Sequence, residues 1–267
     1  MRIGLFQTYL GRHEQPVYPL GLAFIGSVLH HHQREVLCRD LNIYQSPLQE
    51  LEATIKSFQP EMIGLSLRNI DTTQSRDLYY YYLYFQEQIR KIKKIAPDIP
   101  LVVGGSGFSL YADQIMRDNP ELDFGIYREG EETMQELSVK INTPQAVVGL
   151  YYRQNQTVCF TGSRPVLDLA TLPPLKWDLF SLAAYKEVPG ALGVETKRGC
   201  SLQCDYCTYP FLDGRNIRKH PVAHIMSSLE DLVFNHGFSR FTFTDSIFNI
   251  PQDHAHRYQC LVLFLNL

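Results

Sequence analysis

The stretch Met62-Ile-Gly-Leu-Ser-Leu67 is a near-continuous apolar run. Such a run is typical of a strand buried on both faces of a parallel sheet. Similar runs occur at 3–6, 36–38, 101–103 and 124–126, and segments compatible with helices separate them at 20–33, 47–58, 76–95, 111–119 and 131–141. This alternation predicts an α/β fold with a Rossmann-like, doubly wound parallel sheet, which binds its ligand beyond the carboxyl ends of the strands.

The loops after these strands are therefore the first places to look for a site. Gly104-Gly-Ser-Gly107 follows the fourth strand, where missing side chains would let a ligand approach the backbone; the geometry of a turn explains the glycines equally well. Arg128-Glu-Gly-Glu-Glu132 follows the fifth strand. Its Glu131 and Glu132 are candidates either for ligand contact or for a favourable place in the first turn of a helix.

A second informative stretch is Lys197-Arg-Gly-Cys-Ser-Leu-Gln-Cys-Asp-Tyr-Cys207, which spaces Cys200, Cys204 and Cys207 as C-x3-C-x2-C. A structural zinc site needs four protein ligands, and no further Cys or His follows at finger-like spacing. Three thiolates suit a 4Fe-4S cluster with one iron left open. An incidental cysteine cluster or a partial zinc site is the alternative.

This motif, with Tyr206 before its last cysteine, resembles the signature loop of the radical SAM superfamily. The resemblance implies that the open iron chelates S-adenosyl-L-methionine and that the reduced cluster cleaves it to a 5'-deoxyadenosyl radical. A strand-like run at 191–196 precedes the loop, and a helix-compatible segment at 221–235 and a strand-like run at 241–244 follow it. By the same resemblance, Tyr206 and Asp245 are candidate cofactor contacts; a helix-capping role for Asp245 is the alternative.

The first half of the chain resembles the cobalamin-binding domain of cobalamin-dependent radical SAM enzymes. The resemblance rests on Tyr18-Pro-Leu-Gly-Leu-Ala-Phe-Ile-Gly26 and on the glycine-containing segments 64–67, 103–105 and 130–132, and with the cysteine loop it extends from residue 1 to about residue 250. It implies a set of corinoid contacts, which are Ser66, Gly104, Gly105, Ser106 and Gly130.

The D-x-H-x-x-G motif, which supplies a histidine to cobalt in some cobalamin proteins, does not occur in the sequence. Arg68, just after the third strand, is the candidate for the lower face of the cobalt, where a positive charge would discourage a sixth ligand. An ion pair of Arg68 with Asp71 or Asp77 is the alternative.

The predicted domains are a cobalamin-binding domain at 1–145, a β-hairpin and Pro-containing linker at 146–190, and the N-terminal part of a radical SAM βα barrel at 191–267. Each βαβ unit takes about 30 residues or more, so too few residues follow Cys207 for the six units usual in such barrels. The final segment, 259–267, is apolar and uncharged. We therefore expect an incomplete barrel and a truncated member of the family.

Composition sets the remaining limits. The chain has 267 residues, of which 45% are hydrophobic and 20% charged, as in ordinary soluble globular proteins. The net charge of -3 argues against a nucleic-acid partner. Since neither a signal peptide nor a long apolar span is evident, we expect a cytoplasmic protein without a transmembrane segment. In that reducing compartment Cys38 and Cys159 are predicted to be small buried strand residues.

The resemblance implies an enzyme whose cofactors are a 4Fe-4S cluster, S-adenosyl-L-methionine and cobalamin. The expected activity is that of a methyltransferase acting on an unactivated carbon through methylcobalamin and the 5'-deoxyadenosyl radical. The expected partners are a small-molecule or natural-product substrate and a reductant such as flavodoxin or ferredoxin. The alternatives are a corinoid-binding module without turnover and a radical SAM enzyme that catalyses cyclisation or rearrangement.

Overall fold

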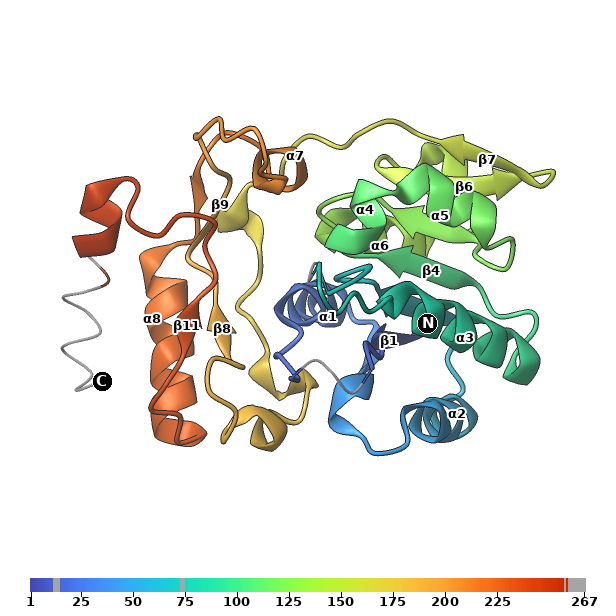
Figure 1. Ribbon diagram of the computed structural model, residues 1–267, viewed down its shortest axis with the longest axis horizontal. Coiled ribbons are helices and arrows are strands. Elements are labelled where there is room, and N and C mark those ends of the chain that lie inside the picture. The colour runs from blue at the N-terminus through green and yellow to red at the C-terminus, as the bar shows by residue number, and fades with distance from the viewer. Residues whose placement is uncertain (12–14, 73–74, 257, 259–267) are drawn as a thin grey trace.

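The computed structural model describes residues 1–11, 15–72, 75–256 and 258, so Cys260 and the apolar segment 259–267 lie outside the described part. A seven-stranded sheet dominates its first part (Figure 1). The first five strands are β1 (Arg2–Gln7), β2 (Glu35–Asp40), β3 (Met62–Ser66), β4 (Leu101–Gly104) and β5 (Phe124–Ile126). All five predicted strands are confirmed.

The strand order is β2-β1-β3-β4-β5, and all of these neighbours pair in parallel. This is the order of a doubly wound, flavodoxin-like sheet, in which the chain reverses direction between β1 and β3. The reversal leaves a crevice beyond the carboxyl ends of these two strands, because the connections leave them toward opposite faces of the sheet. The predicted α/β class is therefore confirmed.

Helices cover both faces of the sheet, because successive side chains of a strand point to opposite sides. Leu5 of β1 belongs to one apolar core with helices α1 (Leu20–His31) and α6 (Glu131–Lys140), whereas its neighbour Phe6 belongs to a second core. That second core contains residues of α2 (Pro47–Phe58), α3 (Tyr81–Ile95), α4 (Ser106–Leu110) and α5 (Ala112–Asp118). In the described part of the chain no helix is long and apolar enough to cross a membrane.

Two of these helices differ from the prediction. The helix expected from residue 76 begins at Tyr81, and the glycine-containing loop after β4 includes the short helix α4. Gly105 precedes α4 with a φ of +101°, and an added Cβ would lie 2.6 Å from the carbonyl oxygen of Leu67. Turn geometry therefore requires a glycine at this position.

The predicted hairpin is confirmed, and it extends the sheet. Strands β6 (Leu150–Gln154) and β7 (Thr157–Phe160) pair antiparallel, and β6 also pairs antiparallel with β5. Cys159 is only half-buried on the edge strand β7, so the prediction that it is buried is wrong. Cys38 is buried in β2 as predicted, and burial raises the pKa of its thiol to about 12.

The second part contains one parallel βαβ unit, with β8 (Gly193–Val194) and β11 (Thr242–Phe243) joined through α8 (Val222–Glu230). This confirms the predicted start of a βα barrel. Between β8 and α8 the chain forms an antiparallel pair of short strands, β9 (Lys197–Arg198) and β10 (Arg218–Lys219). The cysteine loop and the short helix α7 (Tyr209–Leu212) lie between these two strands.

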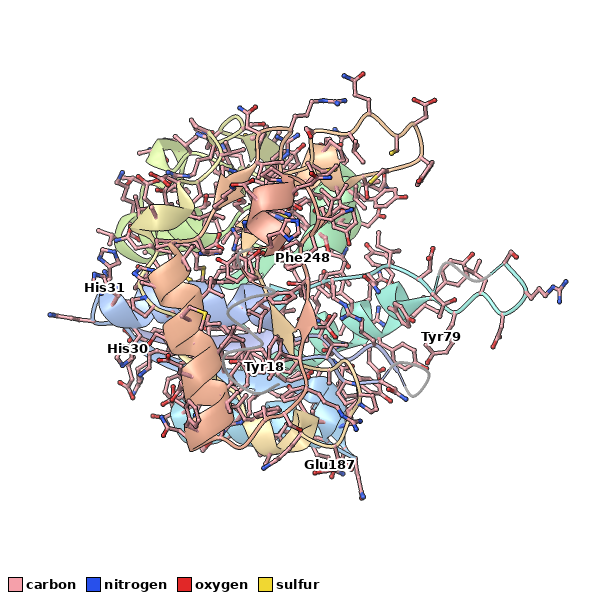
Figure 2. All side chains as sticks on the ribbon, turned by 90° about the vertical axis from the view of Figure 1, so that its left-hand side faces the viewer. Tyr18, His30, His31, Tyr79, Glu187 and Phe248 are labelled. Atoms are coloured by element: carbon pink, nitrogen blue, oxygen red, sulfur yellow. The ribbon has the colours of Figure 1, made fainter. Side chains whose placement is uncertain are left out.

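Tyr18 connects the two parts. Its backbone N–H donates to the carbonyl of Ala191 at 2.8 Å, and its hydroxyl donates to the carbonyl of Trp177 at 2.9 Å. Tyr18 is labelled in Figure 2, and its bond to Ala191 joins the start of α1 to the segment just before β8. The hydroxyl of Tyr185 adds a buried hydrogen bond to Asp40 at 2.7 Å. One apolar core runs through this junction, because its buried residues come from both parts of the chain.

Candidate functional site

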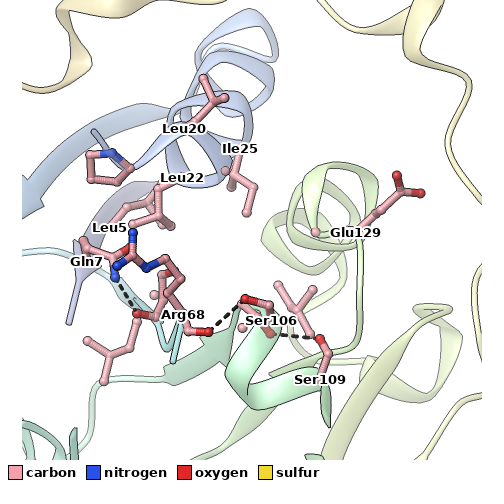
Figure 3. Close-up of a pocket in the computed structure, with 18 of the residues that line it drawn as sticks. Leu5, Gln7, Leu20, Leu22, Ile25, Arg68, Ser106, Ser109 and Glu129 are labelled. Carbon is pink, nitrogen blue, oxygen red and sulfur yellow. Dashed lines mark hydrogen bonds between the residues drawn. The ribbon is translucent and has the colours of Figure 1, made fainter. Parts of the chain in front are cut away.

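A cavity of about 500 Å³ lies at the carboxyl edge of the sheet, against the second part of the chain. The ends of four neighbouring strands reach it, with Gln7 from β1, Ser66 from β3, Gly104 from β4 and Ile126 from β5. Its apolar wall comes mainly from α1, α6 and the sheet (Figure 3), with Leu5, Leu20, Leu22, Ile25, Val102 and Met134. The volume lies within the range of ligand pockets, roughly 300–1,000 Å³.

The six first-domain residues predicted as cofactor contacts all line this cavity; they are Ser66, Arg68, Gly104, Gly105, Ser106 and Gly130. The hydroxyl of Ser106 donates to the carbonyl of Arg68 at 2.9 Å, which ties α4 to the loop after β3. At Gly104, the nearest atom to an added Cβ is in Ile126, at 3.6 Å. The backbone at Gly104 therefore faces the cavity without an intervening side chain of its own.

Arg68 leaves the end of β3 and lies beside Gln7 and Leu5 at the bottom of the cavity (Figure 3). Its Nε is enclosed by protein atoms. Among the carboxylates, Asp40 is near enough that the charge of Arg68 helps to lower its pKa, although burial dominates and raises it. Arg68 thus brings a half-buried positive charge to the crevice between β1 and β3.

The three cysteines lie on the loop between β9 and α7. Cys200 is buried, Cys207 is half-buried and Cys204 is exposed. Backbone hydrogen bonds shape the loop, from Cys200 N to Gly214 O at 3.1 Å and from Cys207 N to Cys204 O at 3.2 Å. Within the described ranges no three Cys, His, Asp or Glu side chains converge as a metal site, so the thiols are not gathered. The donor set itself, three thiols on one loop, fits an iron–sulfur cluster.

Tyr206 and Asp245 are not among the residues that line the cavity. The side chain of Tyr206 is 89% exposed on the cysteine loop. The carboxylate of Asp245 is completely buried and accepts the backbone N–H groups of Thr196 at 2.8 Å and Lys197 at 3.1 Å. Asp245 therefore holds the segment leading into β9 and the cysteine loop, and it caps no helix in that arrangement.

A buried ionic cluster joins the two parts beside the cavity. The guanidinium of Arg198, 8% exposed, donates to Glu131 at 2.7 Å, to Glu195 at 2.8 Å and to Glu129 at 3.2 Å. Glu129 also accepts from Arg218 at 2.7 Å. Burial alone would lower the pKa of Arg198, but Glu131 and Glu195 raise it well above its usual value. Glu131 is thus an interdomain ion-pair partner.

Sequence reasoning missed this cluster. Two of its carboxylates, Glu129 and Glu131, flank Gly130, and its arginine Arg198 directly precedes the Gly-Cys of the cysteine loop. No local pattern reveals the cluster, because the pairing of Glu131 with Arg198 spans 67 positions. The cluster connects the glycine loop of the sheet to the base of the cysteine loop.

Asp213, at the end of α7, also lines the cavity. Burial raises the pKa of its carboxyl from 3.8 to about 6; Arg198 opposes this shift, and Glu195 and Glu129 reinforce it. The raised value means that the folded chain holds the Asp213 proton more tightly than the unfolded chain. The group therefore lowers stability as the pH rises from about 4 to about 6.

We predict that Asp213→Asn stabilises the chain more at pH 7 than at pH 4, by about 2 kcal/mol for a shift of this size. The amide keeps the shape of the protonated carboxyl and cannot ionise. Urea unfolding of both proteins at a series of pH values measures the difference. A stability difference that does not change between pH 4 and pH 7 would contradict the raised pKa.

The fold and the site together define a class of protein. It has a doubly wound, flavodoxin-like domain with a ligand cavity at its switch point, closed by a βα unit that carries a three-cysteine loop.

Comparison with known proteins relates the chain to a domain family and to solved structures. The B12 binding domain family matches residues 7–138. The radical S-adenosylmethionine methyltransferase TsrM from Kitasatospora setae, solved with cobalamin and a [4Fe-4S] cluster, superposes with a TM-score of 0.83 at 22% identity, over 96% of this chain and 51% of that one. The cobalamin-dependent S-adenosylmethionine radical enzyme OxsB superposes with a TM-score of 0.76 at 19% identity. The match covers 98% of this chain and 36% of OxsB. Residues 7–138 thus match the B12 binding domain family, and the chain has the fold of cobalamin-dependent radical SAM enzymes, as the resemblance implied.

Sequence relatives agree with this assignment. An uncharacterized methyltransferase of Pyrococcus horikoshii is 26% identical over 243 residues, which is 89% of this chain and 50% of the relative. An anaerobic magnesium-protoporphyrin IX monomethyl ester cyclase of Synechocystis is 23% identical over 71% of this chain and 37% of the relative. The chain spans about half the length of the first relative and less of the second.

Proposed function

We propose that the chain carries the cofactor-binding half of a cobalamin-dependent radical SAM methyltransferase. The observation that carries the proposal is the cavity at the switch point, whose glycine-rich edge faces the domain with the three-cysteine loop. Methyltransferases also occur among the relatives in sequence and structure. When bound, the cofactors would supply a transferable methyl group and a radical able to abstract hydrogen from an unactivated carbon.

The first domain would hold the cobalamin. The open backbone at Gly104 lets a large planar group or its nucleotide tail approach the sheet, and the wall around Leu22 excludes water. Arg68 would place its charge at the lower face and would donate no electron pair to a metal, because a guanidinium has no acceptor. Arg68 would therefore hold a positive charge near the corinoid without ligating its metal.

The second domain would hold the cluster and the sulfonium cofactor. Cys200, Cys204 and Cys207 would supply three thiolates and leave one coordination position open. Asp245 would act as a positioning residue, because its carboxylate fixes the backbone of Thr196 and Lys197 just before the loop. A small-molecule substrate would enter between the two domains, and a protein such as flavodoxin or ferredoxin would supply the electron.

An anaerobic ultraviolet–visible titration with hydroxocobalamin, on the chain reconstituted with iron and sulfide, tests this proposal. Retention of both chromophores through gel filtration is the expected result. Retention of the corinoid alone would reduce the chain to a corinoid-binding module without turnover. Retention of neither would remove the proposal.

A graded pair of substitutions at Gly104 locates the corinoid. Gly104→Ala adds a Cβ in ordinary contact with Ile126, at 3.6 Å, and should leave folding and binding unchanged. Gly104→Leu carries a branched chain into the cavity and should raise the Kd for hydroxocobalamin at least about tenfold, or about 1.4 kcal/mol. Equal affinities of the two variants would show that the corinoid binds elsewhere.

A cyclase is the second candidate, favoured by the similarity to the anaerobic magnesium-protoporphyrin cyclase. Both reactions would use the same cofactor sites. Incubation with S-adenosyl-L-methionine labelled in its methyl group separates them, because only a methyltransferase would move the label into product.

A further inference from the structure

Arg128 stands out because its backbone conformation is one that arginine rarely adopts. Its φ is +65°, in the left-handed region. A non-glycine residue is uncommon there, and such strain persists only where the surrounding structure holds it. The backbone N–H of Arg128 donates to the hydroxyl of Ser109 at 2.9 Å, which helps to fix this turn at the end of β5.

Two aromatic rings hold the side chain. The guanidinium carbon lies 5.0 Å from the centre of the Tyr127 ring and 4.6 Å from that of Phe211, which belongs to α7 in the second part. The two rings meet edge to face, 6.1 Å apart. A guanidinium over aromatic faces stays charged and keeps its in-plane N–H donors available, so the rings orient it and leave its hydrogen bonds to be made.

Those hydrogen bonds go unused within the part of the chain that the structure describes. The Nε of Arg128 is enclosed and has no partner there, and the guanidinium forms no ion pair with a described residue. The nearby carboxylates already have partners: Glu129 and Glu131 accept from Arg198, and Glu132 pairs with Arg164. Arg128 itself lines the cavity, together with Gly105, Ser106 and Gly130.

We propose that Arg128 is the anion-binding residue of the cavity and receives a phosphate or carboxylate group of a bound ligand. The planar fork of a guanidinium matches two oxygens of either group. One source is the phosphodiester in the nucleotide loop of the corinoid, which rests on the proposed function. The other is an acidic group of a second ligand. In both cases the strained turn holds the positive charge of Arg128 at the cavity. Glycine would adopt the same backbone conformation without strain but would supply no charge there.

The test compares four full-length proteins, which are the wild type, Arg128→Gln, Arg128→Gly and the control Arg164→Gln. Arg164 binds Glu132 and Glu136 on the same helix but does not line the cavity. Glycine adopts a φ of +65° without strain, so Arg128→Gly should fold even if the glutamine variant does not. Each protein is titrated with hydroxocobalamin, with aquocyanocobinamide, which lacks the phosphodiester, and with inorganic phosphate.

We expect both Arg128 variants to bind hydroxocobalamin at least about tenfold more weakly than the wild type, as for loss of a charged hydrogen bond, while cobinamide affinity stays the same. That result assigns the phosphodiester. If corinoid affinities are equal but phosphate raises the melting temperature of the wild type alone, with or without bound hydroxocobalamin, the anion belongs to a second ligand.

Equal hydroxocobalamin affinity and equal phosphate response in wild type and both Arg128 variants would overturn the proposal, as would the same losses in Arg164→Gln. A wild type that binds phosphate through Arg128 but no hydroxocobalamin would keep this inference and remove the proposed function.

Discussion

Replacing Cys204 by alanine should abolish the iron–sulfur absorption of the reconstituted chain and leave its hydroxocobalamin affinity unchanged. Cys204 is exposed on the loop after β9, so the substitution removes a thiolate without opening a hole in the core. The cavity takes its described lining from other residues, and none of the three loop cysteines contributes to it. Loss of the iron–sulfur cluster therefore removes no residue that lines the corinoid cavity. Iron content, the absorption spectrum and a hydroxocobalamin titration of the same sample measure both effects.

The matched control is Cys159→Ala, which removes a half-buried cysteine on the edge strand β7. It should keep the iron content of the wild type. Loss of corinoid affinity together with the cluster in Cys204→Ala would contradict the separation of the two sites. Full iron content in that variant would show that the loop is not the cluster ligand set.

Replacing Arg198 by methionine should destabilise the chain by about 3–5 kcal/mol, because removing one partner of a buried ion pair leaves uncompensated charge. Arg198 is the shared partner of Glu129, Glu131 and Glu195, which come from both domains. The methionine side chain fills much of the same volume, so most of the loss would come from electrostatics. Urea unfolding gives the free energy of unfolding and the m-value for each protein.

Arg117→Met is the comparison for this prediction, since Arg117 pairs with Asp113 on the exposed face of α5. Exposed pairs contribute roughly 0–1 kcal/mol, so this variant should unfold almost as the wild type does. If Arg198→Met cost no more than Arg117→Met, the cluster would be solvated in solution. If Arg198→Met unfolded in two steps and the wild type in one, the ionic cluster would be the contact that makes the two domains unfold together.

Sequence reasoning located the first domain well. Strands such as 62–67 carry near-continuous apolar residues, and that pattern depends only on burial on both faces. The loops after those strands could be placed on one edge of the sheet because parallel strands all end there. The resemblance to cobalamin-binding domains then singled out Ser66 and Gly104 at this edge, and both line the cavity.

The surroundings of other site residues could not be predicted from the sequence. Tyr206 and Asp245 were chosen by motif position, and their surroundings depend on folding: one side chain lies in solvent and the other is enclosed beneath β9. Cys159 was expected to be a small buried strand residue, but β7 is the last strand of the sheet and leaves it half-exposed.

The sequence by itself determined the order of strands and helices, the glycines at the strand ends and the spacing of the three thiols, since all of these depend on residues close together in the chain. Only the tertiary structure decided which distant groups meet. Arg198 finds Glu131 across 67 positions, and Phe211 of the second part covers the guanidinium of Arg128 from the first. Ion pairs and ring contacts of this kind leave no periodic pattern in the sequence, because each needs only a single residue from each part of the chain. Tertiary packing alone brings those two residues together.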